Sequence, residues 1–233
     1  MKVLIGIQAR STSTRLPNKI HMDLGGKPVL QWVLDSCKQA MDFLNRSNLG
    51  VNVDLALLIP KDDKLKDLYE GKVEIVEGSE LDVISRYIKA LHQYDSDYIC
   101  RITSDCPFIP PHIISRCIKS AVIKKSDYIS NVLVRTFKEG YDTEVLSRGL
   151  MQFLDSISEL PEEREHVTLK MFKYQKNQDF DLPFTICHIL QQFDESFITT
   201  SIDTLEEYHK ALNVIKTIKN KRYEAQSTGI CIA

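Results

Sequence analysis

The sequence predicts an α/β fold in which helices cover a mostly parallel β-sheet. Short apolar segments alternate with longer segments whose apolar residues recur at helical spacing. The first apolar segment, residues 2–7, is a nearly continuous run rich in β-branched residues, which is typical of a central strand of a parallel sheet. Right-handed crossovers would join such strands, and ligands would bind outside their carboxyl ends.

The elements follow in order along the chain. We expect strands at residues 2–7, 51–59, 73–76, 97–103, 127–131 and 184–190. Helices are expected at 28–44, 62–70, from Ser79 onward, 111–124, 147–158 and after Asp203, with a frayed tail from residue 218. Ser79 and Asp203 each have the residue type of a helix N-cap.

The chain length of 233 residues suits a single domain spanning 1–233. Periodicity weakens over residues 132–180, which we interpret as an excursion from the sheet. Nothing in this segment resembles a linker or a repeat. The predicted organisation is therefore one Rossmann-like domain with a small insertion.

Composition excludes several classes of protein. A formal net charge of −2 gives no general attraction to nucleic acid or to an anionic membrane. No signal peptide is evident, and no apolar segment approaches the ~20 residues of a membrane span. The six cysteines show no Cys-x-x-Cys spacing, so we expect reduced thiols in a cytoplasmic protein without zinc.

The loop after the first strand carries the strongest functional signal. Residues 7–19 read Ile-Gln-Ala-Arg-Ser-Thr-Ser-Thr-Arg-Leu-Pro-Asn-Lys and bring Arg10, Arg15 and Lys19 to the carboxyl end of that strand. Two guanidinium groups and one ammonium group suit a polyphosphate, although such a loop can also be simply solvated. P-loop and dinucleotide-binding glycine motifs are absent from the sequence.

These motifs resemble a known family. Ile7-Gln-Ala-Arg10, Arg15-Leu-Pro-x-Lys19 and Gly25-Gly26-Lys27-Pro28 are similar to the start of the sugar-activating cytidylyltransferases, which have a nucleotide-diphospho-sugar transferase type of fold. The nearest branch is that of the spore coat polysaccharide biosynthesis protein F. The resemblance implies that this loop wraps the triphosphate of CTP, with Ala9, Arg10 and Lys19 in contact and Arg15 assisting catalysis.

Two aspartates follow the same resemblance. Thr103-Ser-Asp105-Cys-Pro107 lies at the end of the fourth expected strand, where a carboxylate can hold a metal or merely form a turn. The family places a catalytic Mg²⁺ ligand there, and a second one at the position of Asp203. Gly78-Ser79 resembles the family's second nucleotide motif, which implies that Ser79 contacts the cytidine or ribose.

The excursion supplies the expected acceptor site. Its motifs resemble family segments that bind the sugar and form a dimer, so a homodimer is expected. The implied acceptor-binding residues are Tyr141, Asp142, Glu144, Arg164 and His166. Solvated charged faces are the alternative for these residues.

The sequence therefore predicts a CTP-dependent cytidylyltransferase for cell-surface polysaccharide synthesis. It would transfer CMP to a sugar acid or related acceptor and release pyrophosphate. The alternatives are a phosphorylated polyol as acceptor, a metal-dependent glycosyltransferase of related fold, or a silent scaffold protein. The glycosyltransferase would need an Asp-x-Asp motif, whereas Ser104-Asp105-Cys106 offers one aspartate.

Overall fold

A computed structural model describes residues 1–177 and 182–227, and its centre is one seven-stranded sheet. The strand order is β3-β2-β1-β4-β6-β5-β7. The strands are β1 (Lys2–Gln8), β2 (Asn52–Pro60), β3 (Glu74–Gly78), β4 (Tyr98–Thr103), β5 (Tyr128–Ser130), β6 (Glu144–Ser147) and β7 (Ile186–His188).

The sheet is mostly parallel, as the sequence predicts. β1 pairs in parallel with β2 and β4, β2 with β3, and β5 with β7. β6 is antiparallel to both β4 and β5. The carboxyl ends of β1, β2, β3 and β4 therefore meet at one edge, where a ligand site of this fold class lies.

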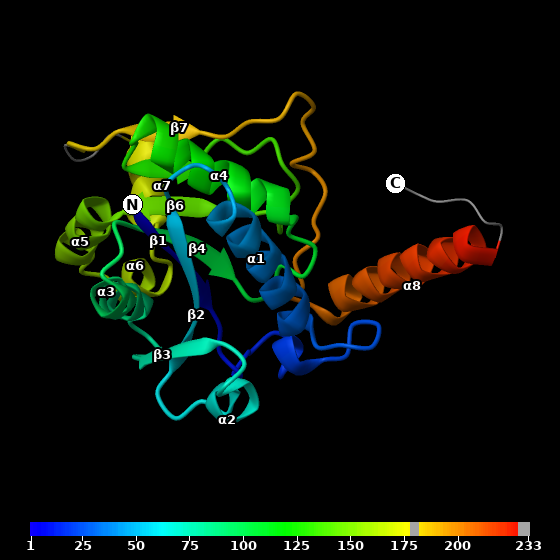
Figure 1. Ribbon diagram of the computed structural model, residues 1–233. Helices are drawn as coiled ribbons and strands as arrows, with labels where there is room; N and C mark the ends of the chain where they lie inside the picture. The colour runs from blue at the N-terminus through cyan, green and yellow to red at the C-terminus, as the bar shows by residue number, and fades with distance from the viewer. Residues whose placement is uncertain (178–181, 228–233) are drawn as a thin grey trace.

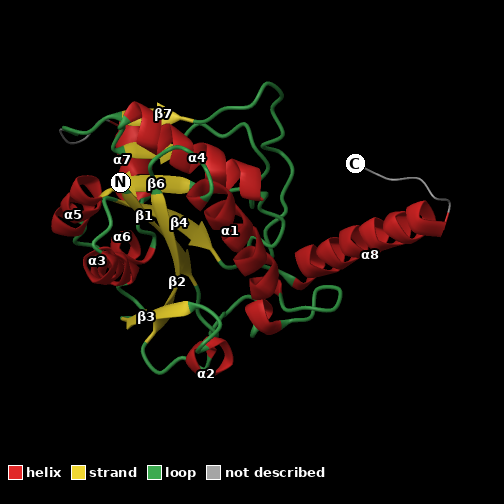
Figure 2. Ribbon diagram, in the orientation of Figure 1, coloured by secondary structure: helices red, strands yellow, loops and turns green. Residues whose placement is uncertain are grey.

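Helices cover both faces of the sheet, and Figures 1 and 2 show α1 and α4 on one side and α3 and α5 on the other. The helical elements are η1 (Lys19–His21), α1 (Val29–Asn45), α2 (Leu65–Tyr69), α3 (Val83–Tyr94), α4 (Pro111–Lys124), α5 (Arg148–Ile157), α6 (Pro161–Glu165), α7 (Leu169–Asn177) and α8 (Leu205–Ser227). The molecule thus has three layers, as expected of a doubly wound α/β domain.

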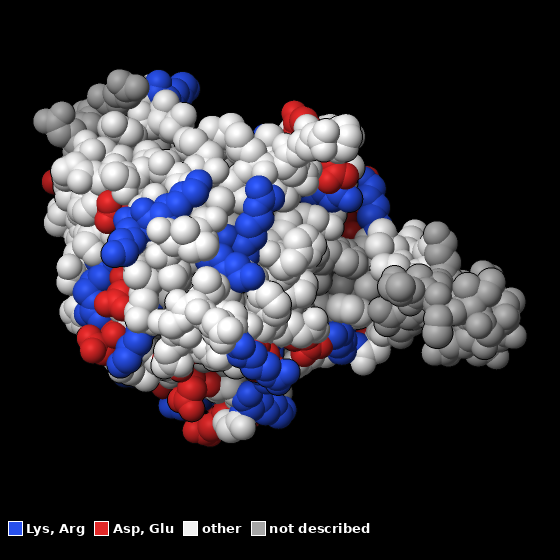
Figure 3. Space-filling model, turned by 45° about the horizontal axis from the view of Figure 1, so that its top comes forward, with Lys and Arg blue, Asp and Glu red and all other residues white. Residues whose placement is uncertain are grey.

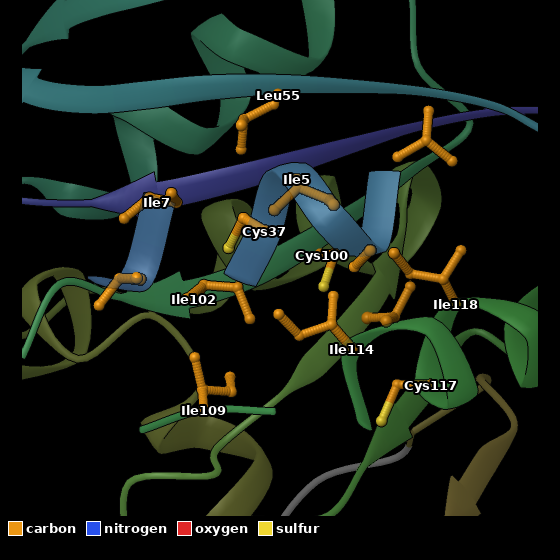
Figure 4. Packing of buried hydrophobic residues seen from close by; sticks show 14 of the residues in the cluster. Ile5, Ile7, Cys37, Leu55, Cys100, Ile102, Ile109, Ile114, Cys117 and Ile118 are labelled. Carbon is orange, nitrogen blue, oxygen red and sulfur yellow. The ribbon is translucent and has the colours of Figure 1, made fainter. Parts of the chain in front are cut away.

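β1 is buried on both faces of the sheet, which explains its nearly continuous apolar sequence. Ile5 and Ile7 belong to the core cluster that includes residues of α1 and α4, part of which Figure 4 shows. Leu4 points to the opposite face and packs in the cluster that includes residues of α3 and α5. All three side chains are completely buried, and each such burial stabilises the fold by about 1.5–3 kcal/mol.

The expected start of the third helix at Ser79 was wrong. α3 begins at Val83, and Asp82 is its N-cap, because the Asp82 side chain accepts a hydrogen bond from the backbone N–H of Ser85. The Ser79 hydroxyl accepts from the N–H of Asp82, one turn earlier. Ser79 therefore shapes the turn before the helix, and Asp82 caps the helix itself.

The segment 132–180 is more closely joined to the sheet than expected, although its residues 178–180 lie outside the described part. It contributes β6, which the sequence analysis missed, and α6 and α7, which it also missed. Met151, Val167 and Met171 are fully buried in the core cluster around α3. A short antiparallel strand and two short helices thus make this segment part of the main body.

The expectation of a frayed tail from residue 218 was also wrong in part. α8 continues to Ser227, and residues 228–233 lie outside the described part of the chain. Ala211 and Ile215 of α8 are buried in a third, smaller cluster that also contains Leu16 and Leu24. Figure 1 shows the helix leading away from the body beyond this contact.

The molecular surface carries mixed charge. Figure 3 shows Lys and Arg side chains scattered among Asp, Glu and uncharged residues on one face, which agrees with the net charge of −2. None of the helices in the described ranges has both the length and the apolar character needed to cross a bilayer.

Candidate active site

A polar cavity of about 320 Å³ lies at the carboxyl ends of β1 and β4. Its walls come from segments that are far apart in the chain: residues 8–19, 80–86, 101–106, 139–142, 165–166 and 201–203. The loop after β1 lines one side, and the loop after β4 with the segment before α8 lines another. The cavity therefore lies where the sheet topology predicts a ligand site.

Lys19 is the centre of the cavity's charge network. Its ammonium nitrogen lies 2.8 Å from Oδ2 of Asp105 and 2.6 Å from Oδ1 of Asp203. The Lys19 side chain is only 14% exposed. The two carboxylates that the sequence analysis placed together are thus brought together by one shared cation.

The backbone also holds the two aspartate-bearing segments together. The N–H of Ile202 donates to the carbonyl oxygen of Asp105 at 2.9 Å. This bond joins the loop after β4 to the residue before Asp203. The closeness of the two carboxylates is therefore supported by the main chain as well as by Lys19.

These ion pairs shift the pKa values of Lys19 and Asp105. Burial lowers the pKa of Lys19, but the hydrogen bonds and charges of Asp105 and Asp203 outweigh it and hold that pKa above its ordinary value. Burial raises the pKa of the Asp105 carboxyl, but the nearby Lys19 ammonium outweighs it and the net pKa is lowered. Both groups are charged at neutral pH.

Arg10 and Arg15 also line the cavity. Nη2 of Arg15 lies 3.1 Å from Oδ1 of Asp203, and the Arg15 side chain is 68% exposed. Nη2 of Arg10 donates to Glu165 at 3.2 Å. Both guanidinium groups are held by exposed, weak ion pairs that a phosphate could replace.

A network of hydrogen bonds fixes the loop that carries these cations. Both the N–H and the hydroxyl of Ser11 donate to the carboxylate of Asp63, at 2.8 and 2.5 Å. The Ser11 hydroxyl also lies 3.0 Å from Nε2 of His21. Ser11 is 9% exposed and its hydroxyl proton is held by Asp63, so these residues anchor the loop and do not form a nucleophilic triad.

Asp203 is free to face the cavity because its neighbour caps α8. The Thr204 hydroxyl accepts from the N–H of Glu207, and the Glu207 carboxylate accepts from the N–H groups of Asp203 and Thr204. This is a capping box in which Thr204 performs the role that the sequence analysis considered for Asp203. The Asp203 carboxylate contacts Lys19 and Arg15 instead.

The expected acceptor residues fall into two groups. Asp142 and His166 line the cavity, and Asp142 is paired bidentately with Arg135 at 2.6 and 2.8 Å. Tyr141 is packed against the first core cluster. The structure brings Asp142 and His166, and not Tyr141, to the cavity wall.

Glu144 and Arg164 lie outside the cavity wall. Glu144 is 1% exposed and accepts hydrogen bonds from Arg101, Tyr128 and Thr168. Arg164 is bonded to the carboxylates of Asp82 and Asp155. Both residues therefore have structural partners, and we do not assign them to the acceptor.

Of the two residues Ala9 and Ser79, for which nucleotide contacts were expected, only Ala9 lies in the cavity wall. Ala9 lines the cavity, and its N–H donates to Leu58 while its carbonyl accepts from Arg86. Ser79 is exposed and does not belong to the cavity wall. Ala9 thus lies in the cavity wall with both its backbone N–H and its carbonyl bonded within the protein, whereas Ser79 acts on the turn before α3.

The sequence analysis did not identify two arginines of the cavity wall, Arg86 and Arg101. Both are charged residues inside apolar patterns, Arg86 in a buried helix and Arg101 in a buried strand. An arginine at a position that the apolar pattern predicts to be buried was the available signal, because arginine is almost never buried without a partner. Arg101 pairs with Glu144 at 2.5 Å and with Gln8 at 3.1 Å.

Comparison with known proteins agrees with this geometry. A family model described as cytidylyltransferase matches residues 4–230. The spore coat polysaccharide biosynthesis protein SpsF of Bacillus subtilis (strain 168) is 27% identical over 213 residues, which cover 88% of this chain and 83% of that protein.

Solved structures give the same result. A cytidylyltransferase from Leptospira borgpetersenii serovar Hardjo-bovis (strain JB197) superposes with a TM-score of 0.74 at 30% identity, covering 94% of this chain and 96% of that one. A CMP:2-keto-3-deoxy-manno-octonic acid synthetase complexed with CTP has a TM-score of 0.65 at 13% identity, covers 93% and 99%, and shows a shared fold. The chain therefore belongs to the cytidylyltransferase family of CTP-dependent nucleotidyltransferases.

Proposed function

We propose that the protein transfers CMP from CTP to a sugar acid or related acceptor and releases pyrophosphate, in cell-surface polysaccharide synthesis. The observation that carries this proposal is the contact of Lys19 with both Asp105 and Asp203 in a polar cavity at the sheet's carboxyl edge. The similarity to SpsF supports the polysaccharide role.

The two aspartates fit a divalent cation. Carboxylate oxygens are the ligands that Mg²⁺ prefers, and Mg²⁺ in nucleotide enzymes is usually held by one or two carboxylates together with substrate phosphates. The described residues include no group of three or more His, Cys, Asp or Glu side chains that could hold a metal. This donor set therefore suits an ion that arrives with its nucleotide.

We propose that Asp105 and Asp203 hold this Mg²⁺. When bound, the ion would neutralise charge on the α-phosphate and orient it. Asp105 and Asp203 would position the ion, and a bound triphosphate would offer Lys19 new anionic partners in place of these carboxylates.

The cationic loop would serve the leaving group. In the reaction, an acceptor hydroxyl oxygen bonds to the α-phosphorus of CTP, the bond to the β-phosphate oxygen breaks, and the hydroxyl proton leaves to solvent. Arg10, Arg15 and Lys19 would neutralise the negative charge that develops on pyrophosphate. Such positioning and charge stabilisation provide most of the rate in phosphoryl transfer.

The acceptor would occupy the side of the cavity nearest β6. Asp142 lies two residues before β6 and lines the cavity, as do Glu139 and His166. Carboxylate and imidazole groups can bind the hydroxyl groups of a sugar or polyol. Product analysis would test the identity of the acceptor. We also propose that the protein is a homodimer, which light scattering would test.

The proposal is tested with purified protein, Mg²⁺, CTP and a panel of acceptors that includes sugar acids and polyol phosphates. We expect pyrophosphate release only with the correct acceptor, and mass spectrometry would identify the product. Thermal-shift measurements with different nucleotides come first. Stabilisation by UTP or a UDP-sugar, without stabilisation by CTP, would contradict the proposal.

A further inference from the structure

Lys19 lies between the two carboxylates that are proposed to hold the divalent ion. Its Nζ is 2.8 Å from Oδ2 of Asp105 and 2.6 Å from Oδ1 of Asp203. The three side chains are largely shielded from solvent, with 14%, 25% and 27% of their surfaces exposed. An ion held by both carboxylates would need oxygens that bind Lys19, or would lie beside its positive charge. Lys19 and a divalent ion thus compete for this pair of aspartates.

The charges in direct contact at this point already cancel. Asp105 and Asp203 contribute two negative charges, and Lys19 contributes one positive charge. Arg15 adds a second positive charge, because its Nη2 lies 3.1 Å from Oδ1 of Asp203. A divalent ion that approaches alone therefore meets a neutral cluster, and displacing Lys19 would leave a largely buried ammonium group without its partners. This arrangement disfavours binding of the free ion.

A triphosphate would change this balance in favour of the ion. Its oxygens carry several negative charges and are strong acceptors for an ammonium group. Lysine has a flexible four-carbon stem and three rotatable donors, so the Lys19 ammonium can turn from the carboxylates to phosphate oxygens within the same cavity. That turn would free Oδ2 of Asp105 and Oδ1 of Asp203, and the phosphates would add further oxygen ligands for the ion. The nucleotide and the ion would therefore each strengthen the binding of the other.

The two aspartates are also held in place by bonds that do not involve Lys19. The N–H of Ile202 donates to the carbonyl oxygen of Asp105 at 2.9 Å, which joins the two segments. The N–H of Asp203 donates to the Glu207 carboxylate at 2.8 Å within the capping box of α8. These bonds keep the backbones of both aspartates at the cavity wall when the Lys19 ammonium turns away.

We propose that Lys19 excludes a free divalent ion from Asp105 and Asp203, and admits it when the ammonium group turns to the phosphates of a bound nucleotide. This inference rests on the proposed function and deepens it, because it couples the ion to the nucleotide. The coupling is reciprocal, since the factor by which the nucleotide raises the affinity for the ion also applies in the other direction. Lys19 thereby serves two sets of partners in turn, the carboxylates first and the phosphates afterwards.

The test measures the affinity for Mn²⁺ in the absence of nucleotide, by electron paramagnetic resonance. Lys19→Met and Lys19→Gln remove the charge, and glutamine keeps an amide donor for the carboxylates, whereas Lys19→Arg keeps the charge. Lys173→Met is the matched control, because Lys173 also contacts two carboxylates, those of Glu162 and Glu163 at 3.4 and 2.7 Å, but does not line the cavity. Thermal melts would check folding, and Lys19→Gln carries the test if Lys19→Met does not fold.

We expect Lys19→Met and Lys19→Gln to bind Mn²⁺ at least about tenfold more tightly than the wild type, which is a typical size for such coupling. Lys19→Arg and Lys173→Met should bind Mn²⁺ as weakly as the wild type does. Adding Asp105→Asn to either uncharged variant should abolish the gain, which would assign the new affinity to this pair of carboxylates.

Three results would overturn the inference and leave the proposed function intact. They are wild-type Mn²⁺ affinity in the uncharged Lys19 variants, an equal gain in Lys19→Arg or Lys173→Met, and a gain that survives Asp105→Asn. Failure of the proposed metal site itself has a different signature. The wild type and Asp105→Asn would then bind Mn²⁺ equally in the presence of CTP, and both the site and the inference would be overturned.

Discussion

Thr204 caps α8 and thereby leaves the carboxylate of its neighbour Asp203 free to contact Lys19 at 2.6 Å. Both residues have the type of a helix N-cap, and only one of them is needed for that role. Asp203 instead places its carboxylate at the cavity wall. The helix cap and the contact with the cavity cations are therefore divided between two adjacent side chains.

This division predicts opposite phenotypes for two neighbouring substitutions. Thr204→Ala should lower the free energy of unfolding by about 1 kcal/mol and largely preserve pyrophosphate release. Asp203→Asn should lower turnover on the order of 100-fold with a small effect on stability, because it removes a charge that the proposed metal site needs. Urea denaturation and a pyrophosphate assay measure the two effects. Equal loss of turnover in both variants would show that the cap and the carboxylate are not separable.

The Glu144–Arg101 pair is predicted to be structural. Glu144→Gln leaves the Arg101 guanidinium without its carboxylate beneath the cavity, so the free energy of unfolding should fall by about 3–5 kcal/mol. Glu206→Gln, which breaks the exposed pair of Glu206 and Lys210, is the control and should have no measurable effect. A Glu144→Gln variant as stable as the wild type would mean that the pair contributes little.

Gly78 should be intolerant of a methyl group. Gly78→Ala pushes against the Arg86 side chain, and overpacking of this kind costs about 1–3 kcal/mol. Gly149→Ala is the control, since a Cβ there meets nothing closer than 3.6 Å and lies within α5. Chemical denaturation should show loss of stability for the first variant and none for the second. Equal stability of Gly78→Ala and wild type would contradict the steric account.

Acid should weaken the fold partly through Glu163. Its carboxylate is 2% exposed; burial raises its pKa, but bonds from Lys173, the Leu160 N–H and Lys170 outweigh burial and lower the pKa to about 2. A lowered pKa in the folded state contributes stability that is complete above the ordinary value of 4.5 and is lost as the pH falls toward 2.

The stability difference between wild type and Glu163→Gln should therefore be largest at neutral pH and shrink between pH 4.5 and about 2. Urea denaturation at several pH values would measure it. A difference that stays constant across this range would show that the Glu163 charge contributes nothing to folding.

The parts of the fold that follow local rules were predictable from the sequence. β1 has an apolar run bounded by a cationic loop, and α4 has its predicted bounds because Pro111 starts it and apolar periodicity continues to Lys124. Asp105 could be placed at the cavity because it directly follows a buried strand. Each of these inferences needed only neighbouring residues.

The parts that depend on distant partners were not predictable. β6 has four residues and becomes a strand by pairing with β4 and β5, and the Glu144 side chain in it is buried by Arg101. Because the segment around Glu144 shows no regular periodicity, its carboxylate was interpreted from the sequence as an acceptor-binding group. The partners of Arg164 were not predictable for the same reason, since Asp82 and Asp155 come from other parts of the chain.

The role of Asp105 and Asp203 as joint ligands of a divalent ion is the central claim, and Mn²⁺ binding in the presence of CTP tests it most directly. Mn²⁺ accepts the same oxygen ligands as Mg²⁺ and can be followed by electron paramagnetic resonance. We predict that Asp105→Asn and Asp203→Asn each weaken Mn²⁺ binding at least about tenfold. Asp155→Asn, a control outside the cavity wall, should bind Mn²⁺ as the wild type does. Wild-type affinity for Mn²⁺ in both cavity variants would contradict the account.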